Sequence, residues 1–167
     1  RGCSVSLPDK NVIKVLNRPM MTYPAIMAQQ AKNIDDIYIS TDGKKLISIA
    51  EDMGIKVILR PKELAKPDSQ HKDAIIHALD WLNERSIFPE IIVVLLCNVG
   101  THTPGVIDKC IDILKNDLDI DSVVTIDERN EYHPLRAKRL GEDGFLKPFM
   151  DINSDMKIST NRQDLEK

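Results

Sequence analysis

Aromatic residues are scarce in this sequence, and it has no long apolar run. Phe, Trp and Tyr make up 4% of the 167 residues. No stretch approaches the roughly 20 apolar residues that a membrane-spanning helix requires, and no secretory signal peptide can be recognised. These absences exclude a membrane protein, and we expect a protein of the cytoplasm.

Basic residues are not in excess either. The net charge is −3 and the isoelectric point is about 5.8, whereas domains that bind nucleic acid usually carry a basic face. We therefore expect no nucleic-acid partner. The 23 Lys and Arg residues can still gather locally around a small anionic ligand.

Cysteine is equally rare. Cys3, Cys97 and Cys110 are odd in number, widely spaced and without a C-x-x-C pattern. Such cysteines are typical of free thiols in a reducing compartment and do not indicate a disulfide framework or a zinc site.

What the sequence does contain is an alternation of short apolar runs and amphipathic segments. The run 91–96, Ile-Ile-Val-Val-Leu-Leu, is the most hydrophobic and predicts a central strand buried on both faces. A hairpin is expected around the turn 141–144. The other predicted strands are 12–16, 34–40, 56–59 and 122–126; the predicted helices are 20–32 (Pro19 in its first turn), 44–53 (ended by Gly54), one from a cap at Asp68 or Ser69 to Leu82, and 106–114.

This alternation predicts an α/β fold, a three-layer α/β/α sandwich with a mostly parallel, Rossmann-like sheet. We expect residues 1–150 to form the nucleotide-binding domain and 151–167 to begin an incomplete C-terminal segment. Ligands of open α/β sheets bind at the carboxyl ends of the strands. The loops to consider are therefore 1–11, 40–43, 60–69 and 97–104.

The first of these loops has the chemistry of an anion site. Gly2 and Ser4 leave its backbone accessible, so that successive N–H groups can point toward one anion. Arg1 adds a forked donor and Lys10 a mobile point charge. This composition suits the phosphates of a nucleotide, although an ordinary basic surface loop looks the same in isolation.

Several motifs occur in one order along the chain and together carry a resemblance. They are Arg1-Gly2-x-Ser4 with Lys10-Asn11, Tyr38-Ile39-Ser40-Thr41-Asp42, Leu59-Arg60-Pro61-x-Glu63-Leu64-Ala65, Asp121-Ser122-Val123-Val124, His133-Pro134-Leu135, Asp143-Gly144-Phe145-Leu146-Lys147-Pro148 and Arg162-Gln163-Asp164-Leu165. In this respect the chain resembles the acylneuraminate cytidylyltransferases (CMP-sialic acid synthetases), which are related to the CMP-Kdo synthetases.

The resemblance implies transfer of CMP from CTP to an acidic nine-carbon sugar of the sialic, legionaminic or pseudaminic type, with release of pyrophosphate. Arg1 and Lys10 would be the catalytic cations that hold the triphosphate, and Asn11 and Arg60 would recognise cytosine. Further nucleotide contacts are implied for Gly2, Ser4, Ser40 and Asp42.

For the sugar, the resemblance points to Cys97, Asn98, His102 and Arg162. It also implies Mg²⁺ or another divalent cation, with ligands expected beyond Lys167, and a homodimer. A short strand precedes the arginine in this family, so we expect the chain to be truncated at both ends.

Two departures leave an alternative open. Val5 and Ser6 stand where the family usually has a lysine and a glycine, and Cys97 replaces a glutamine that faces the sugar. A degenerate homologue that binds nucleotide or a partner without turnover would tolerate these changes. A glycosyltransferase on a similar sheet is a further alternative, but no D-x-D motif follows the predicted central strand.

Four histidines complete the candidates. His71 and His77 fall on a predicted helix, where structural or exposed roles are commonplace. His102 could instead contact an acidic sugar or act as a base, and His133 resembles a family position near the mouth of the active site.

Overall fold

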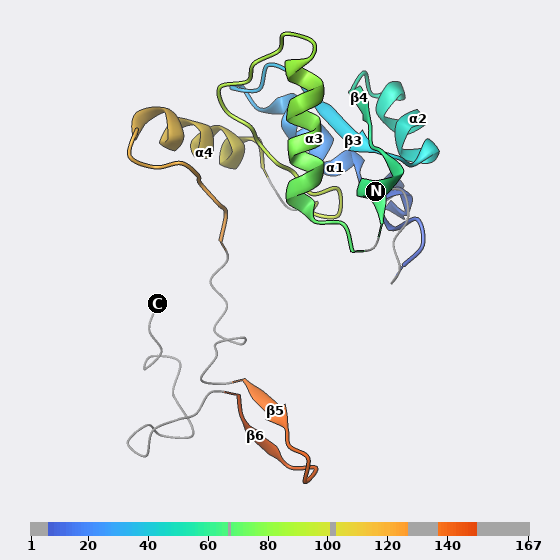
Figure 1. The fold of residues 1–167 in the computed structure, drawn as a ribbon, viewed down its shortest axis with the longest axis vertical. Helices are drawn as coiled ribbons and strands as arrows, with labels where there is room; N and C mark the ends of the chain where they lie inside the picture. Colours follow the sequence, from blue (N-terminus) through green and yellow to red (C-terminus); the bar gives the residue numbers. More distant parts are fainter. Residues whose placement is uncertain (1–6, 67, 101–102, 127–136, 150–167) are drawn as a thin grey trace. The chain divides into compact units, whose positions relative to one another are not determined.

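The computed structural model describes residues 7–66, 68–100, 103–126 and 137–149 (Figure 1). It divides into two compact units, Arg1–Val123 and Val124–Lys167, and each is treated separately below. The expected C-terminal segment 151–167 lies outside the described residues.

A parallel strand pair lies at the centre of the first unit. β3 (Tyr38–Thr41) pairs with β4 (Lys56–Leu59), and Tyr38 lies opposite Lys56 while Thr41 lies opposite Leu59. Helix α2 (Lys44–Asp52) connects the two strands. It ends before Gly54, whose φ of +71° favours glycine. The predicted helix, its terminator and the strand 56–59 are thus confirmed, and β3 is shorter than the predicted strand 34–40.

The chain before this pair differs from the prediction. A short 3₁₀ turn, η1 (Lys10–Val12), leads into a small antiparallel hairpin of β1 (Lys14–Val15) and β2 (Arg18–Pro19). The predicted strand 12–16 is confirmed only at Lys14–Val15. Val12 belongs to η1, and Leu16 and Asn17 have φ of +47° and +65°, values that make a tight turn of the chain there.

Helix α1 (Thr22–Gln30) therefore starts later than the prediction placed it. Pro19 belongs to β2, where it pairs with Lys14, and Pro24 is the proline in the first turn of α1. A proline fits there because the first N–H groups of a helix have no partner within the helix.

Two longer helices follow in the chain. α3 (His71–Asn83) begins after the 3₁₀ turn η2 (Lys62–Ala65), and α4 (Pro104–Asn116) has Pro104 in its first turn. α4 confirms the helix predicted at 106–114. Gln70 occupies the N-cap position of α3, and its side chain makes no capping hydrogen bond. The prediction that Asp68 or Ser69 caps this helix is therefore wrong.

The predicted central strand is the largest disagreement. Residues 91–96 form no helix and, within the described part of the chain, belong to no strand ladder. Residues 122–126 likewise form no strand. Hydrophobicity alone predicts burial, whereas a strand also needs a neighbour for its N–H and C=O groups, and neither segment has one among these residues.

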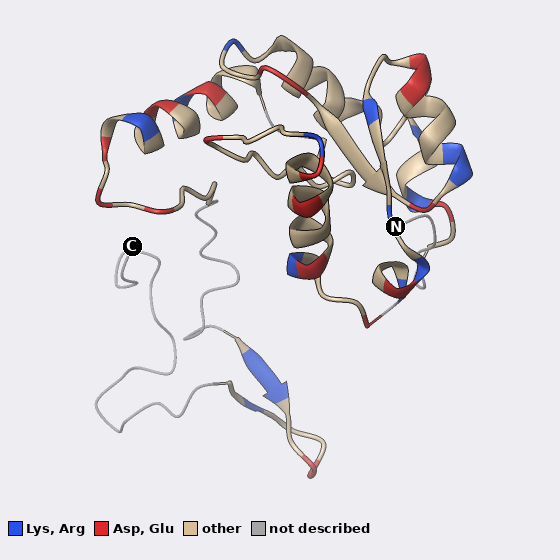
Figure 2. Ribbon diagram, turned by 45° about the horizontal axis from the view of Figure 1, so that its top comes forward, with Lys and Arg blue, Asp and Glu red and all other residues tan. Residues whose placement is uncertain are grey.

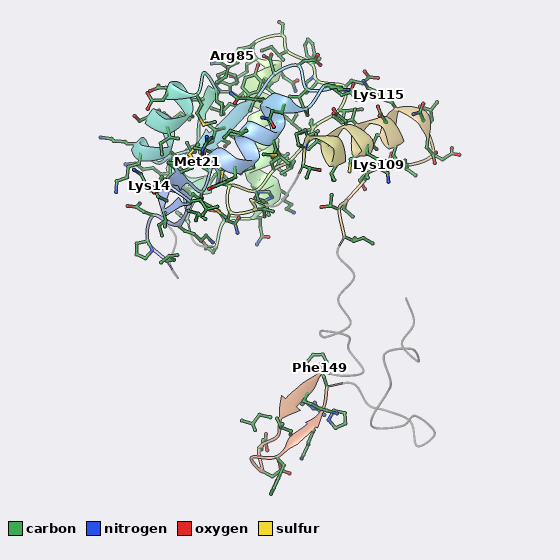
Figure 3. All side chains as sticks on the ribbon, turned by 180° about the vertical axis from the view of Figure 1, so that it is seen from behind. Lys14, Met21, Arg85, Lys109, Lys115 and Phe149 are labelled. Carbon is green, nitrogen blue, oxygen red and sulfur yellow. The ribbon has the colours of Figure 1, made fainter. Side chains whose placement is uncertain are left out.

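Two apolar clusters hold the first unit together. The first joins Met21, Leu46, Ala50 and Ile55, with Ile39 and Val57 packed against it from the strands; Met21 lies among these packed side chains (Figure 3). The second joins Ala31 after α1 to Ile107 and Ile111 of α4, and alternate residues of 91–96 pack against it.

The opposite face of the strand pair meets α3. Tyr38 contacts Trp81 edge-on, with ring centroids 6.1 Å apart. α1 and β3 contain no charged residue, whereas α2, α3 and α4 carry both signs on their surfaces (Figure 2). This distribution follows the hydrophobic effect, because the uncharged elements lie toward the core.

The second unit contains the expected hairpin. β5 (Lys138–Leu140) and β6 (Leu146–Pro148) pair antiparallel, and Leu140 lies opposite Leu146. The connecting turn includes Gly144 with φ +79°. None of the described helices is long and apolar enough to cross a membrane.

Candidate functional site

The candidate site lies where β3 and β4 end. Thr41, the last residue of β3, is 1% exposed. Its hydroxyl accepts a hydrogen bond from the Gly43 backbone N–H at 3.1 Å, and its carbonyl accepts one from the Arg60 N–H at 3.0 Å. The parallel pairing thus continues one residue beyond β4 and fixes the backbone of Arg60.

The strand register brings the side chains of Ser40 and Arg60 together. Ser40 lies opposite Ile58, and Arg60 is two residues further along, so that it emerges on the same face. Arg60 Nε donates to Ser40 Oγ at 3.2 Å, and Arg60 Nη2 donates to the Ser40 carbonyl at 2.8 Å. The predicted nucleotide residues Ser40 and Arg60 are therefore neighbours in space.

Asn11 contributes an unused acceptor. Its backbone carbonyl accepts a hydrogen bond from the Met21 N–H at 2.9 Å, which anchors η1 to the start of α1. Its side-chain oxygen Oδ1 is buried and finds no donor among the described residues. Leaving such an acceptor unsatisfied costs about 1–3 kcal/mol. A ligand with an N–H donor would remove that cost.

The turn that carries Asn11 is tied to α2. Asp9, which precedes η1, forms an ion pair with Lys45 at 2.5 Å. Both side chains are well exposed, so this pair contributes little to stability. Val12 packs against the first apolar cluster, which includes Leu46. Lys10 and Asn11 thus belong to a turn held next to the helix that follows β3.

Cys97 lies near the same place. It packs against the first cluster, and burial raises the pKa of its thiol above the ordinary value. The positive charge of Arg60 acts in the opposite direction but more weakly. Cys97 is therefore a neutral thiol near the end of β4, and a thiol is a weak hydrogen-bonding group.

The remaining predicted residues divide into two groups. Asp42 follows β3 and is half-buried, and Asn98 is exposed in the turn after 91–96. The other candidates lie outside the described residues: Arg1, Gly2, Ser4, His102, His133 and Arg162. Within the described part, the structure places Ser40, Asp42 and Arg60 at the carboxyl ends of β3 and β4.

Two histidines and one threonine complete the comparison with the sequence. His71 is exposed at the start of α3; His77, on the same helix, is half-buried with Nδ1 lacking a partner in the described chain. Thr41 belongs to the motif 38–42 but receives no separate role from the sequence, although it holds both α2 and Arg60. Its position between Ser40 and Asp42, directly before a helix, was the available signal.

A metal site is not formed by these residues. Across residues 7–66, 68–100, 103–126 and 137–149, no group of three or more His, Cys, Asp or Glu side chains could hold a metal ion. Mg²⁺ bound with a nucleotide usually takes only one or two protein carboxylates, and substrate phosphates and water supply its other ligands.

Comparison with known families decides the assignment. The family model described as cytidylyltransferase matches residues 1–130. The chain belongs to the cytidylyltransferase family. The expected membership is thereby confirmed, and the matched region contains β3, β4 and the loop of Asn11.

Individual cytidylyltransferases resemble different lengths of the chain. An N-acylneuraminate cytidylyltransferase of Escherichia coli is 32% identical over 88 residues, 53% of this chain and 21% of the relative. The one of Streptococcus agalactiae is 26% identical over 168 residues, 99% of this chain and 38% of the relative. A CMP-N,N'-diacetyllegionaminic acid synthase of Legionella pneumophila is 26% identical over 116 residues, 69% of this chain and 50% of the relative. This cytidylyltransferase chain thus spans at most half the length of these relatives.

One solved structure shows the same fold. CMP:2-keto-3-deoxy-manno-octonic acid synthetase in complex with CTP superposes with a TM-score of 0.58 at 16% identity, over 70% of this chain and 45% of that one. The cytidylyltransferase chain therefore has the fold of a nucleotide-sugar synthetase.

Proposed function

We propose that the protein carrying this chain transfers CMP from CTP to an acidic nine-carbon sugar and releases pyrophosphate. Family membership and the relatives that act on sialic and legionaminic acids support this proposal. The observation that carries it is the placement of Arg60 by Ser40 at the carboxyl end of the parallel strands, where α/β proteins bind their ligands.

Cytosine fits the polar groups available there. The base presents an exocyclic amine that donates and a ring carbonyl that accepts. In the proposed complex the Oδ1 of Asn11, which has no donor among the described residues, accepts from the amine, and the Arg60 guanidinium donates to the carbonyl. Uracil has a carbonyl in place of that amine, so Asn11 Oδ1 would meet a second acceptor. The site should therefore bind CTP more tightly than UTP.

The phosphates and sugar are assigned from the family pattern. Lys10, on η1 beside Asn11, would hold the triphosphate together with Arg1, Gly2 and Ser4. A sugar hydroxyl would attack the α-phosphorus, and the bond to pyrophosphate would break as the new bond forms. Positioning and neutralisation of charge would provide most of the acceleration. For the sugar we assign Cys97, Asn98, His102 and Arg162.

Other parts of the proposal concern the whole protein. We propose a three-layer α/β/α sandwich for its complete sheet, a homodimer as its assembly, and the cytoplasm as its location. We also propose a requirement for Mg²⁺ or another divalent cation. Removal of divalent ions with EDTA should abolish turnover and their return should restore it.

The test is pyrophosphate release by the full-length protein with CTP, Mg²⁺ and a panel of nonulosonic acids. Release that depends on one acid would support the transferase and identify the acceptor. Binding of CTP without release with any acid would instead support a nucleotide-binding homologue. The neutral, weakly hydrogen-bonding thiol of Cys97 is the observation that favours that second function.

A further inference from the structure

Two hydrogen bonds define how the Arg60 guanidinium is held. Nε donates to the Ser40 hydroxyl at 3.2 Å, and Nη2 donates to the Ser40 backbone carbonyl at 2.8 Å. These two nitrogens form one edge of the planar guanidinium group. Acceptors on both atoms of an edge fix the plane of the group as well as its position.

We propose that Ser40 is a positioning residue for cytosine recognition and acts through Arg60. This role of Ser40 rests on the proposed function, in which the Arg60 side chain contacts the base. On sequence alone the Ser40 hydroxyl was expected to line the nucleotide pocket. In the structure that hydroxyl is an acceptor for Arg60, so its role is to set the angle at which the guanidinium faces a planar pyrimidine.

The local fold explains why this residue can do so. Thr41 fixes the Arg60 backbone through the 3.0 Å bond between the Arg60 N–H and the Thr41 carbonyl. The parallel register then places the Arg60 side chain on the Ser40 face of the sheet. Both side chains are half-buried, which restricts the alternatives open to the guanidinium. Without the hydroxyl, Nη2 would keep its hydrogen bond to the Ser40 carbonyl, and Nε would lose its bond to Ser40.

The experiment measures CTP affinity of the full-length protein by titration calorimetry. Ser40→Ala should weaken CTP binding about tenfold, because the guanidinium loses its fixed angle and its hydrogen bond to the base becomes weaker. Ser40→Thr keeps the hydroxyl and should stay within about twofold of the wild type. Ser48→Ala, an exposed serine on α2, is the matched control and should leave affinity unchanged.

A double-mutant cycle separates positioning from direct contact. If Ser40 acts through Arg60, Ser40→Ala should have no further effect on CTP affinity in an Arg60→Ala background. If the two losses add, Ser40 acts independently of Arg60 and the inference is wrong. Should Ser40→Ala lower the melting temperature, Ser40→Cys takes its place, because a thiol fills the same space as a weak acceptor; unaltered CTP affinity in Ser40→Cys would contradict the inference.

Failure of the proposed function gives a different result. Wild-type protein that does not bind CTP contradicts the proposed function, and the role of Ser40 falls with it. Wild-type protein that binds CTP, with Ser40→Ala binding equally well, contradicts only the role of Ser40.

Discussion

The β3–β4 pair and the segment 91–96 are both short, yet only the first forms a ladder among the described residues. β3 and β4 are joined by a single helix, α2, and pair in parallel over their whole length. Segment 91–96 is the more hydrophobic of the two regions and has no strand partner among the described residues. The comparison teaches that hydrophobicity selects what is buried, whereas a ladder needs a second backbone alongside.

In segment 91–96, packed and exposed side chains alternate as they do on the two faces of a strand. Ile91, Val93 and Leu95 pack against the cluster of Ile107 and Ile111. The alternate residues are about half exposed: Ile92 is 46%, Val94 48% and Leu96 45% exposed. This period of two is that of a pleated backbone. One face is therefore stabilised by packing, and the other gains little from burial.

The largest expected effect contrasts one residue from each region. Ile58 in β4 is 1% exposed, and Ile58→Ala should lower the free energy of unfolding by about 3 kcal/mol through lost burial and a cavity. Val94→Ala should cost less than about 1 kcal/mol, because this side chain is already half in water. Urea denaturation of both variants measures the difference, and equal losses would show that 91–96 is as tightly packed as β4.

A smaller effect is expected at the end of β3. Thr41→Val keeps the shape of the side chain but removes the hydroxyl that accepts from the Gly43 N–H. The half-buried donor at the start of α2 then loses this partner, and unfolding should require about 1 kcal/mol less. Thr41→Ser retains the hydroxyl and is the matched control for this bond. A Thr41→Val protein as stable as the wild type would show that this bond does not hold α2.

The smallest effect concerns the thiol that follows 91–96. Because burial raises the pKa of Cys97, less thiolate is present at any given pH than for an ordinary thiol. Alkylation at pH 8 should therefore be slower at Cys97 than at a model thiol and should increase as the pH rises. Peptide mapping locates the adduct, with Cys97→Ser as control. Rapid labelling at pH 8 would show that the thiol is exposed.

The sequence was sufficient where structure depends on neighbours in the chain. β4, α2 and Gly54 were predicted because an amphipathic period, a terminator and a following apolar run lie within one short stretch. The proximity of Ser40 and Arg60 also followed, since both come after strands that end at the same edge.

Long-range pairing and turn conformation could not be predicted in this way. The hairpin of β1 and β2 depends on positive φ at Leu16, and leucine is rarely found in that conformation. The missing ladder of 91–96 depends on which backbone lies beside it, a property that its own residues do not encode. The hydrogen bonds of Arg60 to Ser40 depend on the strand register, which became visible only with the structure.

The most direct test of cytidine recognition is pyrophosphate release with CTP compared with UTP, at a fixed concentration of the acceptor sugar. We predict release with CTP, much slower release with UTP, and loss of this preference in Asn11→Ala, because Asn11 Oδ1 is the acceptor assigned to the cytosine amine. Equal rates with both nucleotides in the wild type would contradict the proposed recognition of cytosine by Asn11 and Arg60.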